Sequence, residues 1–259
     1  MHRILLFDLD GTLLKTDKTI SDKTLAAVRA SREKGCIIGI STSRSESNSR
    51  KFTGALAPDI IISSGGAMVT LNGEVIVAEE FSGSETADII SAAREICGDL
   101  NITADTADKN AEYFMNCELP EDELKKSWGK AIYDDFNDFK RPALKLCFEI
   151  ADENKAKALA DRLDYCDCIH FTDGDWYKFT KKGVTKETAI EKLCSHIGIT
   201  SADMTAFGDD LADIGMLKMC GTGVAMGNAL DEVKAAADVV IGTNDEDGIA
   251  EYLETMLRK

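Results

Sequence analysis

The chain has 259 residues, 44% of them hydrophobic and 29% charged, so it is long enough and apolar enough to bury a core. Thirty basic residues against 46 acidic ones give a net charge of −16, which repels nucleic acid and anionic membranes, and neither is expected as a partner. Anionic substrates are repelled too. A phosphate site in this chain therefore needs its own cation, from a lysine, an arginine or a metal.

The sequence shows no targeting signal. Its first apolar run, within residues 1–7, is followed at once by acidic residues and is too short for a signal peptide. No apolar run approaches the ~20 residues that span a bilayer. Eight cysteines are scattered without a CxxC pair. A zinc site or disulfides are one interpretation, but we favour reduced thiols in a cytoplasmic protein.

Strands and helices alternate in the first third of the chain. Apolar runs predict buried strands, a serine cap and a stop at Gly35 delimit a helix, and Asn72-Gly73 is typical of a hairpin turn. The predicted elements are strands at 3–7, 36–40 and 59–63, a helix at Ser21–Lys34, and hairpin strands at 67–71 and 74–78.

The last third returns to this alternation, whereas the middle third has a mixed pattern. Alternation at both ends predicts a parallel sheet covered by helices on both faces. We therefore expect an α/β fold in which a discontinuous, Rossmann-like core, residues 1–82 and 179–259, carries an inserted α/β cap domain at 83–178. The middle elements are helices at 84–99 and 153–163 and strands at 101–104, 112–116, 143–150, 169–172 and 176–179. In the last third of the chain we expect helices at 185–196, 211–218, 229–236 and 247–257 and strands at 204–207, 221–225 and 239–241.

The strongest local signal is the pair Asp8 and Asp10, in the run Phe7-Asp8-Leu9-Asp10-Gly11-Thr12-Leu13. Open α/β sheets bind ligands at the carboxyl ends of their strands, and acids two residues apart on an extended chain point to the same side. One acid can then attack while the other shuttles a proton. The alternatives are an Asx turn and a calcium loop, but the twelfth position of such a loop would be Thr19.

A second acidic run, Gly208-Asp209-Asp210-Leu211-Ala212-Asp213, follows another apolar strand. Asp209 and Asp213 lie one helical turn apart and share a face. Taken alone, this run is best explained as an acidic helix N-terminus. Together with the first pair it predicts a magnesium site at Asp8, Asp10, Asp209 and Asp213, because magnesium prefers oxygen ligands.

Two further elements are candidates for phosphate binding. Thr42 and Ser43 follow the second strand, where hydroxyls and amides can cradle a phosphate, although a helix cap is an equal explanation. Lys186 begins a predicted helix and could neutralise phosphoryl charge, although a solvated basic surface is the default. GxxxxGK[ST] and GxGxxG motifs are both missing, which argues against a P-loop nucleotidase and a dinucleotide oxidoreductase.

These motifs occur in an order that resembles the haloacid dehalogenase-like phosphatases, and the insertion before the lysine resembles their Cof-type branch. The motifs are Asp8-Leu-Asp10-Gly-Thr, Thr42, Lys186 and Gly208-Asp209 with Asp213. The resemblance covers nearly the whole chain. It implies that Thr42 and Lys186 hold the phosphoryl oxygens and that the cap selects the leaving group.

The resemblance also implies roles for the acids. Asp8 attacks phosphorus and becomes an aspartyl-phosphate, and Asp10 protonates the leaving alcohol and then activates water. Magnesium is held by the Asp8 and Asp209 carboxylates and the Asp10 carbonyl, while Asp213 orients Lys186 or the metal-bound waters. These roles agree with phosphoryl transfer as a problem of positioning and charge neutralisation.

Four positions depart from the family pattern. Ser43 and Glu187 stand where glycine is usual, and Gly65 and Ala212 stand where asparagine is usual. The nucleophile, acid, lysine and metal carboxylates are all present, so we expect an active enzyme whose specificity and efficiency the departures affect.

We therefore expect a magnesium-dependent hydrolase of small phosphate monoesters, sugar phosphates or related metabolites, acting as a monomer or homodimer. The alternatives are a phosphomutase of the same superfamily and a non-catalytic phosphate-binding protein.

Overall fold

The computed structural model describes residues 4–109, 113–117, 131–171 and 174–258. The chain forms two compact units. The first contains residues 1–44, 49–77 and 185–259, and the second contains residues 45–48 and 78–184. The predicted domain boundaries at 82/83 and 178/179 stay predictions.

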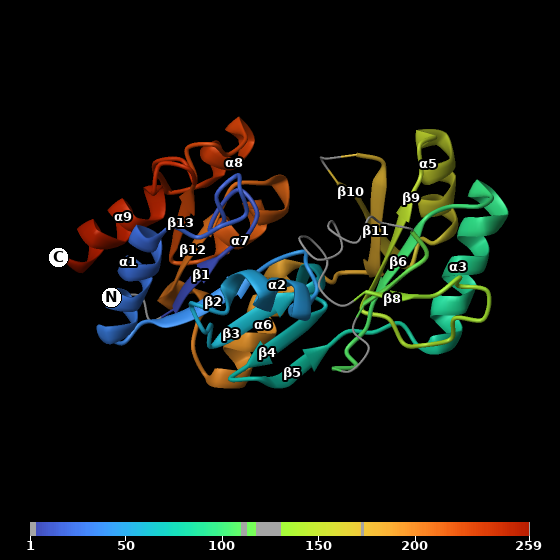
Figure 1. The fold of residues 1–259 in the computed structure, drawn as a ribbon, viewed down its shortest axis with the longest axis horizontal. Coiled ribbons are helices and arrows are strands. Elements are labelled where there is room, and N and C mark those ends of the chain that lie inside the picture. The colour runs from blue at the N-terminus through green and yellow to red at the C-terminus, as the bar shows by residue number, and fades with distance from the viewer. Residues whose placement is uncertain (1–3, 110–112, 118–130, 172–173, 259) are drawn as a thin grey trace. The chain divides into compact units, whose positions relative to one another are not determined.

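The described part of the first unit contains an eight-stranded sheet (Figure 1). Its strands are β1 (Ile4–Phe7), β2 (Ile37–Ser41), β3 (Ile60–Ser63), β4 (Met68–Leu71), β5 (Glu74–Ala78), β12 (Met204–Gly208), β13 (Thr222–Ala225) and β14 (Val239–Val240). The order is β14-β13-β12-β1-β2-β3-β4-β5, and the strands from β14 to β3 are parallel. All four residues of β1 are buried, as expected for a strand covered on both faces.

The hairpin between β4 and β5 turns at Asn72 and Gly73, whose φ angles of 51° and 84° are those of a type I′ turn. In the centre of the sheet, the rings of Phe7 and Phe207 stack with their centroids 4.6 Å apart. This contact joins the two strands that carry the acidic motifs.

The helices of the first unit match the predicted ones apart from two differences. The polar helix α2 was not predicted because Phe52 is the one apolar residue in its sequence, ESNSRKFT. The predicted helix at 211–218 begins as a single 3-10 turn, Leu211–Asp213. None of the helices in the described ranges is long and apolar enough to cross a bilayer. The helices are α1 (Asp22–Glu33), α2 (Glu46–Thr53, of which residues 49–53 belong to this unit), α6 (Lys186–Ile197), α7 (Ile214–Met219), α8 (Asp231–Ala236) and α9 (Gly248–Leu257).

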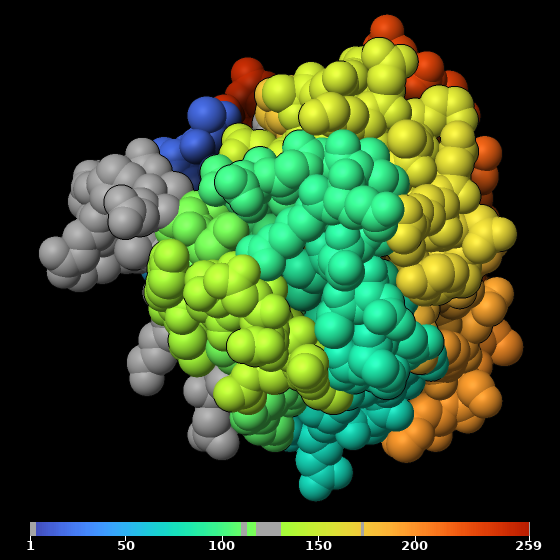
Figure 2. All heavy atoms as spheres, turned by 90° about the vertical axis from the view of Figure 1, so that its right-hand side faces the viewer, coloured from blue at the N-terminus to red at the C-terminus, as the bar shows by residue number. Residues whose placement is uncertain are grey.

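The second unit has its own sheet and its own apolar core. Its strands are β6 (Ile102–Asp105), β7 (Tyr113–Met115), β8 (Ile132–Tyr133), β9 (Lys145–Glu149), β10 (Cys166–His170) and β11 (Trp176–Lys181), in the order β10-β11-β9-β6-β7-β8. Two helices, α3 (Gly83–Cys97) and α5 (Glu153–Arg162), lie side by side (Figure 2). Apolar side chains such as Ile89, Phe148 and Phe179 fill the core. Glu112 and Thr172, which belong to predicted strands, lie outside the described residues.

Candidate active site

The candidate residues lie at the carboxyl ends of three adjacent parallel strands. Asp8 follows β1, Thr42 follows β2, and Asp209 follows β12. In the register of the sheet, Phe7 lies opposite both Phe207 and Ile40, so these three chain segments leave the sheet at nearly the same level. This edge is where open α/β sheets bind ligands.

Lys186 is the first residue of α6, and its ammonium is buried between two carboxylates. The Nζ atom lies 2.6 Å from Asp8 Oδ1 and 2.6 Å from Asp213 Oδ1. Burial alone would lower the pKa of Lys186, but the charges of Asp213 and Asp8 outweigh it and raise the pKa. Lys186 is therefore a cation at any physiological pH.

Asp213 uses both of its oxygens inside the protein. Its Oδ1 accepts the bond from Lys186, and its Oδ2 accepts bonds from the backbone amides of Asp209 (3.0 Å) and Asp210 (3.1 Å). Gly208 makes room for this arrangement, because a Cβ at Gly208 would collide with the Asp213 side chain. Asp213 thus holds the lysine and the loop after β12 in one geometry.

Three carboxylates, those of Asp8, Asp209 and Asp213, offer oxygens that all lie within 4.8 Å of one another. Burial raises the pKa of Asp8 well above its usual range, although Lys186 acts in the opposite direction. Burial also raises the pKa of Asp209 to about 6, with Asp213 adding to the effect and Thr12 opposing it. Each raised pKa means that the partners of the carboxylate do not fully compensate its ionised form for burial.

The cluster fits a hard divalent cation. Its donors are carboxylate oxygens, which magnesium prefers. Thr12 Oγ1 donates to Asp209 Oδ1 at 2.6 Å, whereas a Cβ on Gly11 would occupy the space beside Asp209 Oδ2. Gly11 has a φ of 78°, which suits glycine. Glycine at position 11 therefore lets the loop backbone approach the Asp209 carboxylate closely.

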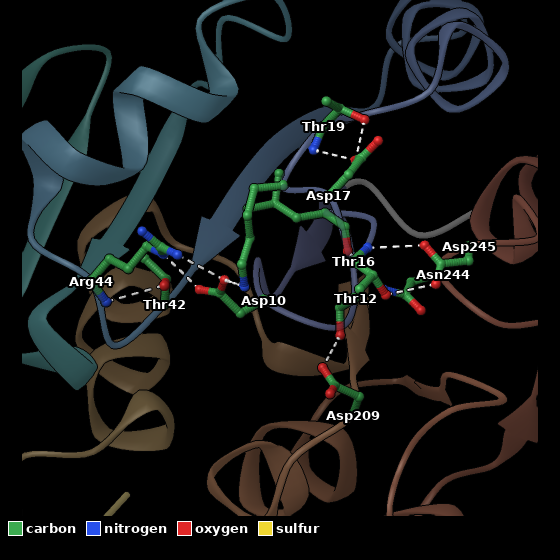
Figure 3. A network of polar contacts seen from close by, with 12 residues as sticks. Asp10, Thr12, Thr16, Asp17, Thr19, Thr42, Arg44, Asp209, Asn244 and Asp245 are labelled. Atoms are coloured by element: carbon green, nitrogen blue, oxygen red, sulfur yellow. Dashed lines mark hydrogen bonds and ion pairs between the residues drawn. The ribbon is translucent and has the colours of Figure 1, made fainter. Parts of the chain in front are cut away.

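Asp10 lies outside this three-acid cluster and makes two ion pairs (Figure 3). Arg44 binds it with two bonds, Nε to Oδ2 at 2.6 Å and Nη2 to Oδ1 at 2.8 Å, and Lys18 Nζ lies 2.7 Å from Oδ1. Burial would raise the pKa of Asp10, but the bonds and charges of Arg44 and Lys18 lower it to about 2. The guanidinium of Arg44 also lies over the Phe52 ring, 4.7 Å from its centroid.

Thr42 is buried in the loop after β2. Its Oγ1 accepts a bond from the backbone amide of Arg44 at 3.1 Å, which leaves its hydroxyl proton for an incoming oxygen (Figure 3). The amide of Gly65 donates to the Thr42 carbonyl at 3.0 Å. Ser43 is half-buried in the same loop and does not adopt a positive φ, so serine is accommodated there without backbone strain.

Two of the other three departures from the family pattern also have structural explanations. Gly65 has a φ of 73°, a left-handed conformation that glycine and asparagine both tolerate. The backbone shape is therefore kept, although the side-chain carboxamide of the usual asparagine is missing. Glu187 lies against Gly215 of α7, where a Cβ would overlap its carboxylate. Nothing in the structure explains Ala212.

Three residues of this site were not singled out from the sequence. Thr12 belongs to the same motif as Asp8, so its position near the three clustered carboxylates could have been inferred. Arg44 directly follows the predicted phosphate-binding residues Thr42 and Ser43, but its pairing with Asp10 needs the fold. Lys18 carries no local signal, since it approaches Asp10 only because the chain turns back at a φ of 65°.

The comparisons with known proteins agree with this geometry. A family model described as haloacid dehalogenase-like hydrolase matches residues 5–253. The chain belongs to the haloacid dehalogenase-like hydrolase family. A 5-amino-6-(5-phospho-D-ribitylamino)uracil phosphatase of Bacillus subtilis is 30% identical, with 97% of this chain and 94% of that protein aligned. An HMP-PP phosphatase of Serratia proteamaculans is 25% identical, with 100% of this chain and 96% of that protein aligned.

Solved structures show the same fold. A haloacid dehalogenase-like hydrolase from Bacteroides thetaiotaomicron has a TM-score of 0.85 at 24% identity, over 99% of this chain and 100% of that one. A subclass IIB sugar phosphatase has a TM-score of 0.81 at 26% identity, over 98% of both chains. The predicted Cof-type family, α/β fold and phosphatase activity are confirmed.

Proposed function

We propose that this family member is a magnesium-dependent phosphatase that hydrolyses small phosphate monoesters through an aspartyl-phosphate on Asp8. The buried ammonium of Lys186, 2.6 Å from both Asp8 and Asp213, carries the proposal. It holds a carboxylate nucleophile beside the positive charge that a transferring phosphoryl group needs. The predicted roles of Thr42 and Ser43, which would bind the phosphoryl oxygens, belong to the same proposal.

In the first step, an Asp8 oxygen attacks phosphorus, and the bond between phosphorus and the ester oxygen breaks. The leaving oxygen takes a proton from Asp10. In the second step, water attacks the aspartyl-phosphate, Asp10 takes back a proton, and inorganic phosphate leaves while the Asp8 carboxylate is restored. Lys186 neutralises charge on the phosphoryl oxygens in both steps.

Asp10 is ionised in the conformation described, because two cations hold its pKa at about 2. That state suits the second step, in which Asp10 accepts a proton. The first step needs the protonated acid, so the Asp10 carboxylate must first leave its ion pairs with Arg44 and Lys18. A phosphate dianion competes with Asp10 for the same two cations and can cause this release.

Asp8 and Asp209 would hold the magnesium ion, which would neutralise negative charge so that the Asp8 carboxylate and the phosphate can approach each other. Asp213 would support the site from behind, since one of its oxygens binds Lys186 and the other binds two backbone amides. The predicted contact from the Asp10 carbonyl remains part of the proposal.

The proposed substrates are phosphorylated small metabolites. Three relatives support this class: one is named for a phosphoribitylamino-uracil, one for HMP-PP, and one is a sugar phosphatase. The eight cysteines all lie in the described ranges and are not joined in disulfides, which is compatible with the predicted cytoplasmic location.

The test is a panel of phosphate esters assayed with magnesium for the wild type and for Asp8→Asn, Asp10→Asn and Asp17→Asn. Asp17 lies in the same loop but binds only Thr19, so its variant is the matched control. We expect Asp8→Asn to abolish phosphate release, Asp10→Asn to slow it by at least 100-fold, and Asp17→Asn to leave it unchanged. Mass spectrometry of acid-quenched Asp10→Asn should find phosphate on Asp8. Full activity in Asp8→Asn would contradict the nucleophile assignment.

A further inference from the structure

The loop after β1, residues 8–19, is held on its outer side by two asparagines from the last third of the chain. Asn228 Nδ2 donates to the Gly11 carbonyl at 2.7 Å, and Asn244 Nδ2 donates to the Leu14 carbonyl at 2.8 Å. The two asparagines are themselves joined, because the Asn244 amide donates to Asn228 Oδ1 at 3.0 Å. They therefore act on the loop as one connected group.

Asp245 extends this group by one residue. Its carboxylate accepts two bonds from Thr16, one from the backbone amide at 2.9 Å and one from the hydroxyl at 2.6 Å. Figure 3 shows Asn244 and Asp245 pointing toward the loop, opposite the side on which Arg44 binds Asp10. The loop is thus anchored from two sides.

The turn that carries Asn228 is also bonded to the loop after β12. The amide of Met226 donates to the Gly208 carbonyl at 3.0 Å, and the amide of Leu230 donates to the Asp209 carbonyl at 3.2 Å. Asn228 consequently stands between the two chain segments that carry Asp8 and Asp209. Its side chain binds the loop after β1, and the backbone amides on either side of it bind the loop after β12.

Small movements at Gly11 matter because the backbone there lies directly against the Asp209 carboxylate. We infer that Asn228 is a positioning residue for the divalent cation: its amide holds the Gly11 peptide so that the Asp8 and Asp209 oxygens face one ion. This inference rests on the proposed metal site and extends it to a residue that does not touch the ion. Outer partners of this kind typically change metal affinity by 10–100-fold.

The exposure of Asn228 makes the inference testable. Its side chain is exposed and fills no core, so truncation should leave the stability of the protein nearly unchanged. A purely structural tie would alter the melting temperature without altering metal affinity. A hydrogen bond that positions the metal ligands would instead alter metal affinity without altering the melting temperature.

The experiment is titration of the metal-free protein with Mn²⁺, followed by electron paramagnetic resonance. We expect Asn228→Ala to weaken Mn²⁺ binding about tenfold, and Asn228→Asp to weaken it at least as much, because an oxygen would then face the Gly11 carbonyl. Asn244→Asp, which leaves Asn228 in place, should have a smaller effect. The control is Asn101→Ala, which removes an exposed asparagine bond, Nδ2 to Glu149 Oε2, in the other unit.

A second measurement separates metal positioning from substrate binding. In Asn228→Ala the magnesium activation constant should rise about tenfold, while KM for p-nitrophenyl phosphate at saturating magnesium stays within twofold. Mn²⁺ affinity within twofold of wild type in both Asn228 variants would overturn the inference. Failure of the wild type to bind Mn²⁺, or unchanged binding in Asp209→Asn, would instead overturn the proposed metal site and the inference with it.

Discussion

Replacing Asp209 with asparagine should make the metal-free protein more stable while it removes metal binding. In the folded protein the pKa of Asp209 is about 6 instead of its ordinary 3.8, mainly because the carboxylate is buried and then because Asp213 lies nearby. Between these two pH values the folded state holds a proton that the unfolded state has already lost. The free energy of unfolding therefore falls as the pH rises through this window, and it stays lower above about pH 6.

The size of the effect follows from the pKa. A rise from 3.8 to about 6 corresponds to about 3 kcal/mol at pH 7. Asp209 is only half-buried, so solvent screening reduces the expected gain to about 1–2 kcal/mol, or roughly 2–8 °C in melting temperature for a protein of this size.

The assay is thermal unfolding in EDTA from pH 3.5 to 8, compared between wild type and Asp209→Asn. The two proteins should melt together below about pH 4, and the variant should melt higher above about pH 6. Magnesium at 100 times its Kd should stabilise the wild type by about 2.7 kcal/mol and the variant not at all. Asp17→Asn is the control with the opposite sign, because bonds from Thr19 lower the pKa of Asp17. A difference that does not change with pH, or a variant that melts lower at pH 7.5, would refute the reasoning.

Three further substitutions test other parts of the site. Lys186→Met leaves two buried carboxylates without their cation and should cost about 3–5 kcal/mol of unfolding free energy in urea at pH 7. Gly11→Ala, at a φ of 78° and against Asp209, should cost roughly 1–2 kcal/mol for the backbone and abolish magnesium stimulation. Arg44→Gln should raise the pKa of Asp10 from about 2 toward its ordinary value, measured by carbon-13 NMR of the carboxyl group.

Control variants and contradicting results can be stated for each of these three substitutions. Lys23→Met breaks an exposed ion pair and should leave the free energy of unfolding nearly unchanged, so an equally small effect of Lys186→Met would contradict the buried-pair argument. Gly73→Ala has a similar φ of 84° with nothing within 4 Å, so it isolates backbone strain from the clash at Gly11. An unchanged Asp10 titration in Arg44→Gln would mean that Lys18 alone holds that carboxylate ionised.

The elements of the fold could be predicted because their signals are local. Apolar runs located β1, β2, β3 and β12, and Asn72-Gly73 located the hairpin. The helix α2 was missed, since seven of its eight residues are polar and Phe52 alone does not make an apolar repeat at helical spacing. The segment at 211–218 was predicted to be one helix, but Asp213 bonds back to the amides of Asp209 and Asp210, which holds the first turn in a 3-10 form.

The site was predictable only where its residues lie in short motifs. Asp8, Asp209 and Asp213 do cluster in the structure, and Lys186 lies among them. The partners of Asp10 could not be found in this way. Arg44 is 34 residues from Asp10 in the chain, and no spacing rule joins an arginine after one strand to an acid after its neighbour.

The charge balance of the site explains why a phosphatase with this acidic cluster would need a metal. Asp8, Asp209 and Asp213, when ionised, carry three negative charges against the single positive charge of Lys186. The site then has a net charge of −2, which repels a phosphate dianion. A divalent cation would bring that sum to zero, and in the proposed mechanism Arg44 would supply positive charge nearby once the substrate takes it from Asp10. Metal binding and substrate binding thus relieve the same electrostatic deficit, so each should strengthen the other.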